Sequence, residues 1–221
     1  MTDNNLVFKS PIKLLGDISE NLTFGAVLAR AGVGKTAFLV QIAIDGLLKN
    51  ENVLHVSIDD SLKKVSLWYE ETFKNITDIS GIKWQDAEAV FEKLLPKRFI
   101  MTFKAEQFGI PIFMERLFDL TEQDIFKPNL VIIDGFSFSS DTKELEEFKK
   151  FAETKNFQIW FALLTHRSKK MPAISSEWLK IFEKAILLKP DNVVNVEMLK
   201  GIADKDKNFI LAPSTMLLTK L

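Results

Sequence analysis

The fold class follows from one segment near the start of the chain, Ala26-Val27-Leu28-Ala29-Arg30-Ala31-Gly32-Val33-Gly34-Lys35-Thr36. An apolar run opens this segment, and two glycines precede its final lysine and threonine. Glycine adopts backbone angles closed to other residues, so successive N–H groups can turn inward around phosphate oxygens. The helical pattern that follows would direct its free N–H groups at the same point. We therefore expect strand, phosphate-binding loop and helix; the ordinary alternative is a glycine turn with a solvated lysine.

The residues of this loop have separate expected tasks. Lys35 would reach the outer phosphates of a nucleotide, and the hydroxyl of Thr36 would ligate Mg²⁺. The full pattern opens with a glycine where this chain has Ala29, the smallest possible replacement, which we interpret as a tolerated variation. The expected phosphate-binding residues are Arg30, Ala31, Gly32, Val33, Gly34, Lys35 and Thr36.

Composition limits the remaining possibilities. The chain has 221 residues, 47% of them hydrophobic, and no linker rich in proline or glycine, so we expect one domain over residues 1–221. With no cysteine and two histidines, a disulfide framework, a thiolate metal site and a histidine cluster are excluded. The polar start at residues 1–5 and the lack of a long apolar run predict a cytoplasmic protein without a membrane segment. A net charge of −1 argues against a surface built wholly for nucleic acid.

Apolar runs and helical patterns alternate along the chain, which predicts an α/β fold with a mostly parallel sheet covered on both faces. In the helix expected at 34–49, the polar residues Gln41, Asp45 and Lys49 recur every four positions and predict one water-facing stripe. Late strands suggest antiparallel hairpins at one sheet edge. The expected strands are 26–28, 53–58, 99–103, 130–133, 158–164, 185–188, 193–199 and 209–211. The expected helices are 34–49, 61–73, 84–95, 111–125, 175–183 and one capped by Asp141 and Glu144 that runs to 155.

A second chemical signal is the carboxylate at the end of the apolar strand Leu130-Val131-Ile132-Ile133-Asp134. After a phosphate loop, an aspartate in this position typically holds Mg²⁺ beside the loop threonine. A buried strand also often ends in aspartate as a turn residue, so the assignment of Asp134 depends on the loop.

Together the loop, the acid-tipped strands and the terminal hairpins resemble the RecA-like ATPase core, especially its KaiC-type and replicative-helicase-type branches. The resemblance covers about Phe24 to Leu221 and implies ATP and Mg²⁺ as cofactors. It also implies that carboxylates after the second strand polarise the attacking water, and the matching positions are Asp59 and Asp60. Aspartate is shorter than the glutamate of the family, so we expect slow hydrolysis. Alternatively, Asp60 and Ser61 cap the next helix.

The resemblance further implies that His166, at the end of an apolar strand, contacts the terminal phosphate and reports its loss. A plain surface histidine is the alternative, and His55 is expected to be a packed or edge residue. Family members complete the site with a neighbour's Lys-x-Arg pair, in which Lys200 matches the lysine and Ile202 replaces the arginine. Lys200 therefore acts alone, or assembly and hydrolysis are weakened, or it is an ordinary solvated lysine. A homo-oligomeric ring is expected by analogy alone.

Three readings of function remain open. The first is an ATP-binding protein that uses Mg-ATP as a conformational or assembly switch with slow or partner-stimulated hydrolysis. The second is a motor on single-stranded nucleic acid, for which Phe136 and Phe138 could stack on bases and a basic cluster could contact phosphates. The alternative for the two phenylalanines is that they are packed under their loop. The third is a degenerate family member that binds a nucleotide or only a protein partner and catalyses nothing. The basic cluster consists of Arg167, Lys169 and Lys170.

Overall fold

The computed structural model describes residues 6–20, 22–136, 142–164, 176–201 and 208–221. Within them, nine strands form a single sheet in the order β3-β2-β4-β5-β1-β6-β7-β8-β9. Strands β1 to β6 pair in parallel with one another, and the pairs from β6 through β7 and β8 to β9 are antiparallel. The strands are β1 Phe24–Ala29, β2 Val53–Ile58, β3 Arg98–Phe103, β4 Leu130–Asp134, β5 Gln158–Leu164, β6 Lys184–Pro190, β7 Val194–Lys200, β8 Phe209–Leu211 and β9 Leu218–Lys220.

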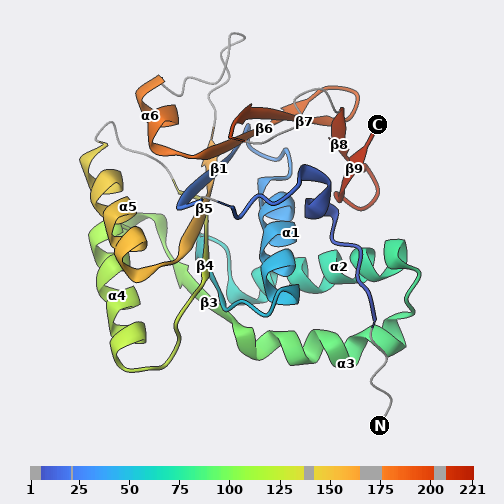
Figure 1. Cartoon of the computed structure of the whole chain (residues 1–221), viewed down its shortest axis with the longest axis horizontal. Coiled ribbons are helices and arrows are strands. Elements are labelled where there is room, and N and C mark those ends of the chain that lie inside the picture. The colour runs from blue at the N-terminus through green and yellow to red at the C-terminus, as the bar shows by residue number, and fades with distance from the viewer. Residues whose placement is uncertain (1–5, 21, 137–141, 165–175, 202–207) are drawn as a thin grey trace.

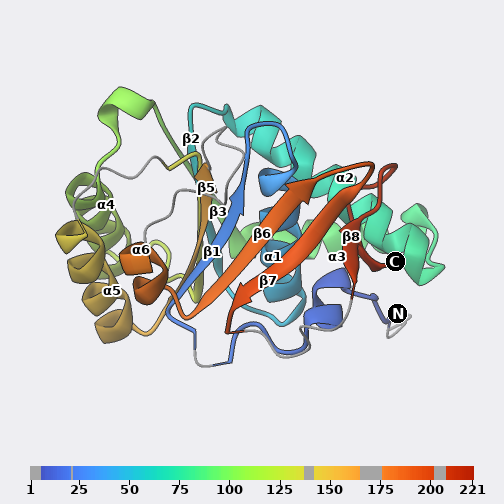
Figure 2. The ribbon, with the colours of Figure 1, turned by 90° about the horizontal axis from the view of Figure 1, so that it is seen from above.

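Helices cover both faces of the sheet, as Figure 1 shows. One face carries α1, α2 and α3, and the other carries α4, α5 and α6. Figure 2 shows β6 and β7 side by side next to β1, where the sheet changes from parallel to antiparallel pairing. The helices are α1 Lys35–Leu48, α2 Leu62–Ser80, α3 Trp84–Leu94, α4 Ile110–Glu122, α5 Lys143–Lys155 and α6 Ser176–Ile181, with short 3-10 helices η1 Pro11–Leu15, η2 Leu95–Lys97 and η3 Ala105–Gln107.

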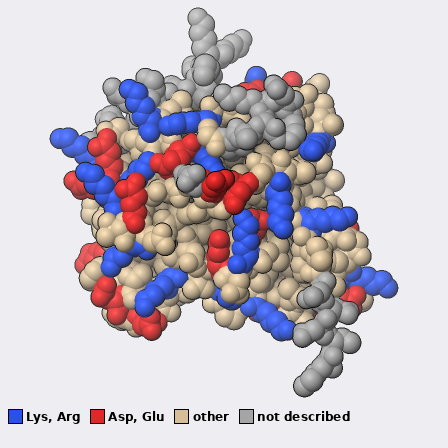
Figure 3. Space-filling model, in the orientation of Figure 1, with Lys and Arg blue, Asp and Glu red and all other residues tan. Residues whose placement is uncertain are grey.

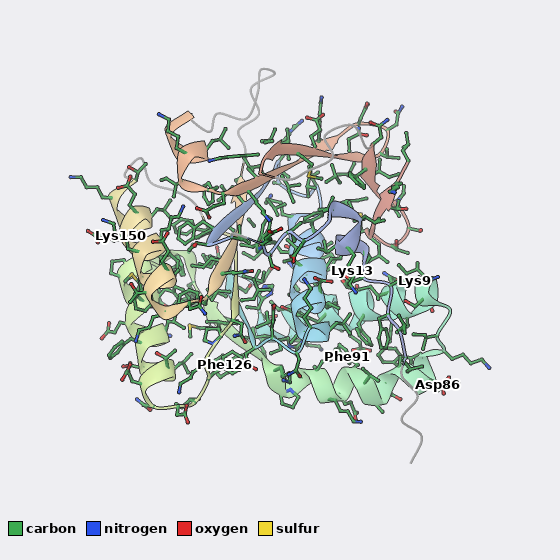
Figure 4. The ribbon with its side chains drawn as sticks, viewed as in Figure 1. Lys9, Lys13, Asp86, Phe91, Phe126 and Lys150 are labelled. Carbon is green, nitrogen blue, oxygen red and sulfur yellow. The ribbon has the colours of Figure 1, made fainter. Side chains whose placement is uncertain are left out.

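Two apolar cores lie on the two faces of the sheet. All residues of β1, β2 and β4 are buried, as expected for parallel strands covered on both sides. The core under α4 and α5 is rich in phenylalanine, and Phe24 lies 5.0 Å from Phe161 between ring centroids. On the other face, Phe91 of α3 points toward α2 and packs 5.0 Å from Phe73 (Figure 4). Lys150, on α5, is exposed and points away from the molecule in the same view.

Most expected elements are confirmed, including a mostly parallel sheet with antiparallel strands at its C-terminal edge. Helix α2 runs seven residues further than expected, to Ser80, because its buried positions continue through Thr77. Strand β9 was not predicted, since three residues carry little periodicity. Helix α5 begins at Lys143 after Thr142, and the proposed cap Asp141 lies outside the described residues.

The expectation of a water-facing stripe on α1 is wrong for two of its three members. Gln41 is fully buried and Asp45 is 5% exposed, whereas Lys49 is exposed as expected. Gln41 binds the backbone of the C-terminal hairpin, and Asp45 pairs with Lys49 at 2.9 Å. Gln41 thus meets the C-terminal hairpin instead of water, and Asp45 is bound to Lys49 of the same stripe.

Candidate functional site

The topology brings the loop before α1 to the end of β4, although β5 separates the two strands. Strand β1 ends at Ala29, and α1 packs against β1, β5, β4 and β2. As a result the hydroxyl of Thr36 donates to Asp134 Oδ2 at 2.5 Å. The two residues expected to hold a metal therefore lie in direct contact, at the carboxyl edge of the parallel strands where ligands of such sheets bind.

The loop itself depends on two glycines with positive φ. Gly32 and Gly34 have φ values of 76° and 106°, in the region that favours glycine. Val33 is buried and anchors the loop, while Arg30, Ala31 and Gly32 are exposed. Helix α1 starts immediately afterwards, with Phe38 N–H donating to the Gly34 carbonyl at 3.0 Å. The N-terminal N–H groups of a long helix are thus directed at an exposed, glycine-bearing loop.

Lys35 folds back over this loop. Its ammonium group donates to the carbonyls of Ala29 at 3.3 Å and Arg30 at 3.1 Å. Burial lowers the pKa of Lys35, and the nearby carboxylate of Asp134 opposes this shift. The hydrogen bonds that the amine makes to described residues thus go to neutral carbonyl oxygens, which an anionic ligand can replace.

Asp134 is a buried acid, with 8% of its surface exposed. Burial raises its pKa above the ordinary value; the hydrogen bond from Thr36 and the charge of Lys35 oppose this rise, and the charge of Asp60 adds to it. Burying a carboxylate costs free energy unless charge or hydrogen bonds compensate. The balance at Asp134 is unfavourable to its charged form, so a cation at this point would relieve the cost.

The donors available suit Mg²⁺. The described residues contain no group of three or more His, Cys, Asp or Glu side chains placed to hold a metal ion alone. A hydroxyl and a carboxylate together are a typical protein contribution to Mg²⁺ when the ligand's phosphates and water supply the remaining oxygens. Thr36 and Asp134 fit that role and would hold the ion beside the loop.

Asp59 has a structural task in this conformation. It is exposed, with φ of 71°, and its N–H donates to the Phe103 carbonyl at 2.8 Å. Its carboxylate accepts the N–H of Ala105 at 2.9 Å, at the start of η3. The side chain expected to orient water therefore binds the backbone that follows the edge strand β3.

Asp60, the next residue, is half-buried, and its charge adds to the raised pKa of Asp134. Its carboxylate pairs with Lys64 at 2.6 Å, while Ser61 accepts the Lys64 N–H at 3.3 Å and forms the cap of α2. The capping alternative thus holds for Ser61, and Asp60 is left half-buried between its lysine and the site.

Lys200 lies far from the loop of its own chain. In the sheet it is opposite Ala185, whereas the loop follows Ala29, which pairs with Leu188. Three to four residues of strand between them correspond to roughly 10–13 Å. The Lys200 ammonium donates to the carbonyls of Leu179 at 2.8 Å and Lys180 at 3.4 Å. In this conformation Lys200 therefore binds the backbone near α6 and not the loop.

Several predicted residues lie outside the described residues, namely His166, Ile202, Phe138 and the basic cluster Arg167, Lys169 and Lys170. Phe136 is described and packs 5.4 Å from Phe108 and 6.0 Å from Phe161, which favours the packed alternative. On the face in Figure 3, described basic and acidic side chains lie interspersed.

Sequence reasoning missed two sets of residues next to the site. Gln41 and Met216 join the loop to the C-terminal hairpin, and the only hint was one amide in an otherwise apolar helix segment. His55, Tyr69 and Arg98 form a buried polar cluster on the same face of the sheet. His55 Nδ1 lies 3.0 Å from the Tyr69 hydroxyl, and the Arg98 guanidinium lies 4.6 Å from the Tyr69 ring centre. His55 is thus a packed residue, as expected.

Comparison with known proteins adds no relative. No protein-family model matches the sequence, and no curated protein matches it significantly. Among the described residues, no helix combines the length and apolar character needed to cross a bilayer.

Proposed function

We propose that this chain is a RecA-like ATP-binding protein that uses Mg-ATP as a conformational or assembly switch. The observation that carries the proposal is the 2.5 Å hydrogen bond between Thr36 and Asp134, which joins the glycine loop to the acid at the end of β4. A chance glycine turn would have no reason to meet a buried carboxylate two strands away. The pairing is the arrangement that a phosphate-bound Mg²⁺ needs.

The residues of this chain divide the work of binding. The loop N–H groups and the N-terminus of α1 would bind phosphate oxygens, and Lys35 would exchange the Ala29 and Arg30 carbonyls for a charged partner. Thr36 and Asp134 would hold Mg²⁺, which when bound neutralises phosphate charge. ATP as the nucleotide rests on the family resemblance.

Binding is better supported than rapid hydrolysis. The carboxylate of Asp59 accepts a hydrogen bond from the Ala105 N–H, and the carboxylate of Asp60 is paired with Lys64. A general base needs a free carboxylate within hydrogen-bond reach of the attacking water. Turnover by this arrangement is therefore slow unless a partner or nucleotide frees Asp60 from Lys64. Because the charge of Asp60 acts on Asp134, Asp60 is the acid that we propose for this task in place of Asp59.

Ring assembly, which the resemblance implies, would assign Lys200 a place in a neighbouring site. Its ammonium group would first have to leave the carbonyls of Leu179 and Lys180. Ile202, two residues later, offers no positive charge. Hydrolysis aided by a neighbour is accordingly expected to be weak even in an assembly.

The proposal is tested by calorimetric titration of the purified chain with ATP, with and without Mg²⁺. Lys35→Ala should weaken binding by about tenfold or more, the loss of a charged hydrogen-bond partner. Lys64→Ala is the matched control and should bind normally, because Lys64 contacts Asp60 and not the loop. Absence of ATP binding by the wild type, or equal binding by Lys35→Ala, would overturn the proposal. Turnover stimulated by single-stranded DNA, and lost in salt, would favour a motor instead.

A further inference from the structure

The turn between β8 and β9, residues 212–217, packs against Gly34 of the phosphate loop. A Cβ atom placed on Gly34 would lie 2.4 Å from Met216 Cε and 3.3 Å from Leu211 Cδ1. Met216 itself has φ of 56°, a conformation that few residues with side chains adopt. The end of the chain is therefore held in an unusual backbone conformation that places an apolar side chain directly against the loop.

Gln41 fastens this turn to α1. Its amide nitrogen donates to the carbonyls of Met216 at 2.9 Å and Ala37 at 3.1 Å, and its amide oxygen accepts the Leu218 N–H at 2.8 Å. The side chain is fully buried. A buried amide with all these bonds satisfied is costly to disturb, so it specifies where the turn lies.

Further bonds make the turn stiff and connect it to α2. The Met216 N–H donates to the Ala212 carbonyl at 2.7 Å, and the Ala212 N–H to the Leu217 carbonyl at 2.8 Å. The Asn75 side chain donates to the Thr215 carbonyl at 3.3 Å. One turn thus contacts the loop and α1, which carries Lys35 and Thr36, and also α2, which follows Asp60.

We propose that this turn, through Met216 and Gln41, holds the phosphate loop in its ligand-binding shape and couples nucleotide occupancy to the C-terminal edge of the sheet. The coupling rests on the proposed function, whereas the support of the loop does not require a nucleotide. Gly34 is the last residue before α1, so a shift there moves Lys35 and Thr36 together. Any coupling between loop and hairpin is reciprocal: what stabilises one stabilises the other.

Hydrogen exchange of the nucleotide-free protein tests the support. Met216→Ala removes the contact with Gly34 and should speed exchange of amides in 33–40 by about tenfold. Met101→Ala is the matched control, because Met101 is partly buried on β3 at the opposite edge of the sheet and packs in the other core. Faster exchange confined to the hairpin, or equal effects of the two variants on 33–40, would overturn the proposal.

Titration with Mg-ATP tests the coupling. Met216→Ala and Gln41→Leu should bind about five- to tenfold more weakly than wild type, while Met216→Leu, which keeps the apolar contact, should bind nearly normally. ATP should in turn slow exchange in 209–220 of the wild type. A merely structural role predicts that affinity follows melting temperature, so Met101→Ala of equal stability should bind as weakly, and that result would overturn the coupling. If the wild type binds no ATP, the proposed function and the coupling fail together, and exchange without nucleotide still decides the support.

Discussion

Two aspartates lie at the carboxyl ends of neighbouring parallel strands, Asp134 as the last residue of β4 and Asp59 directly after β2. Their burial and their hydrogen-bond partners differ. Asp134 is buried against Thr36 with a raised pKa, so its charged form is held at a cost. Asp59 is exposed, accepts a backbone N–H and stabilises the turn after β3. A carboxylate kept at a cost has the character of a binding group, whereas one satisfied by the backbone has the character of a structural group.

The largest expected effect is that of Asp134→Asn on binding. The amide can still accept the Thr36 hydroxyl but carries no charge for Mg²⁺, so affinity for Mg-ATP should fall about a hundredfold. Calorimetric titration measures this, with affinity for ATP in EDTA as the control that should change little. Unchanged affinity in the presence of Mg²⁺ would remove Asp134 from the metal site.

The same variant should be as stable as the wild type or more stable in the absence of ligand. The pKa of Asp134 is raised in the folded protein, so the folded state favours the protonated carboxyl. The contribution of Asp134 to the free energy of unfolding is therefore fully present below the ordinary carboxyl pKa of 3.8 and is lost as pH rises through the raised value. The stability advantage of Asp134→Asn should therefore grow from pH 4 toward neutrality in urea unfolding. A stability loss at pH 7 would make Asp134 a structural residue like Asp59.

The pH response of Asp134 must be separated from that of His55, whose effect is the next largest. Burial, aided by the charge of Arg98, lowers its pKa from 6.5 to about 3. Its contribution to stability is full above pH 6.5 and is lost as pH falls toward that lowered value, at about 1.4 kcal/mol per unit. We expect a loss of about 2 kcal/mol between pH 6.5 and 5 that His55→Gln lacks. If the free energies of unfolding of the wild type and of His55→Gln changed in parallel with pH, this prediction would be contradicted.

Substitutions of Asp59 should have the smallest effect and should act on stability alone. Asp59→Ala loses the acceptor for the Ala105 N–H and disfavours the positive φ, at about 1–2 kcal/mol, whereas Asp59→Asn tolerates both and should cost little. Neither should alter ATP affinity. Steady-state turnover by Asp60→Asn, compared with Asp59→Asn, sharpens the contrast, since only the Asp60 variant should slow whatever hydrolysis occurs.

Expectations from sequence succeeded where the signal is local. The strands 53–58, 158–164 and 209–211 and the first helix follow from apolar periodicity, glycine and flanking residues, all of which act within a few positions. They were less reliable where a long-range contact decides. Gln41 is polar and was expected to be exposed, but the β8–β9 turn buries it. Asp59 and Asp60 are adjacent and chemically alike, and their different surroundings come from β3, α2 and β4.

The amino-acid sequence by itself determined the strand, the glycine loop and the helix around Lys35, because backbone freedom and hydrophobic periodicity are properties of neighbouring residues. It also determined that a carboxylate would end the β4 strand. Only the tertiary structure decided that Thr36 meets Asp134, that Asp59 binds the Ala105 N–H, and that Met216 lies against Gly34. These contacts depend on strand order and register, which bring together segments that no local pattern connects.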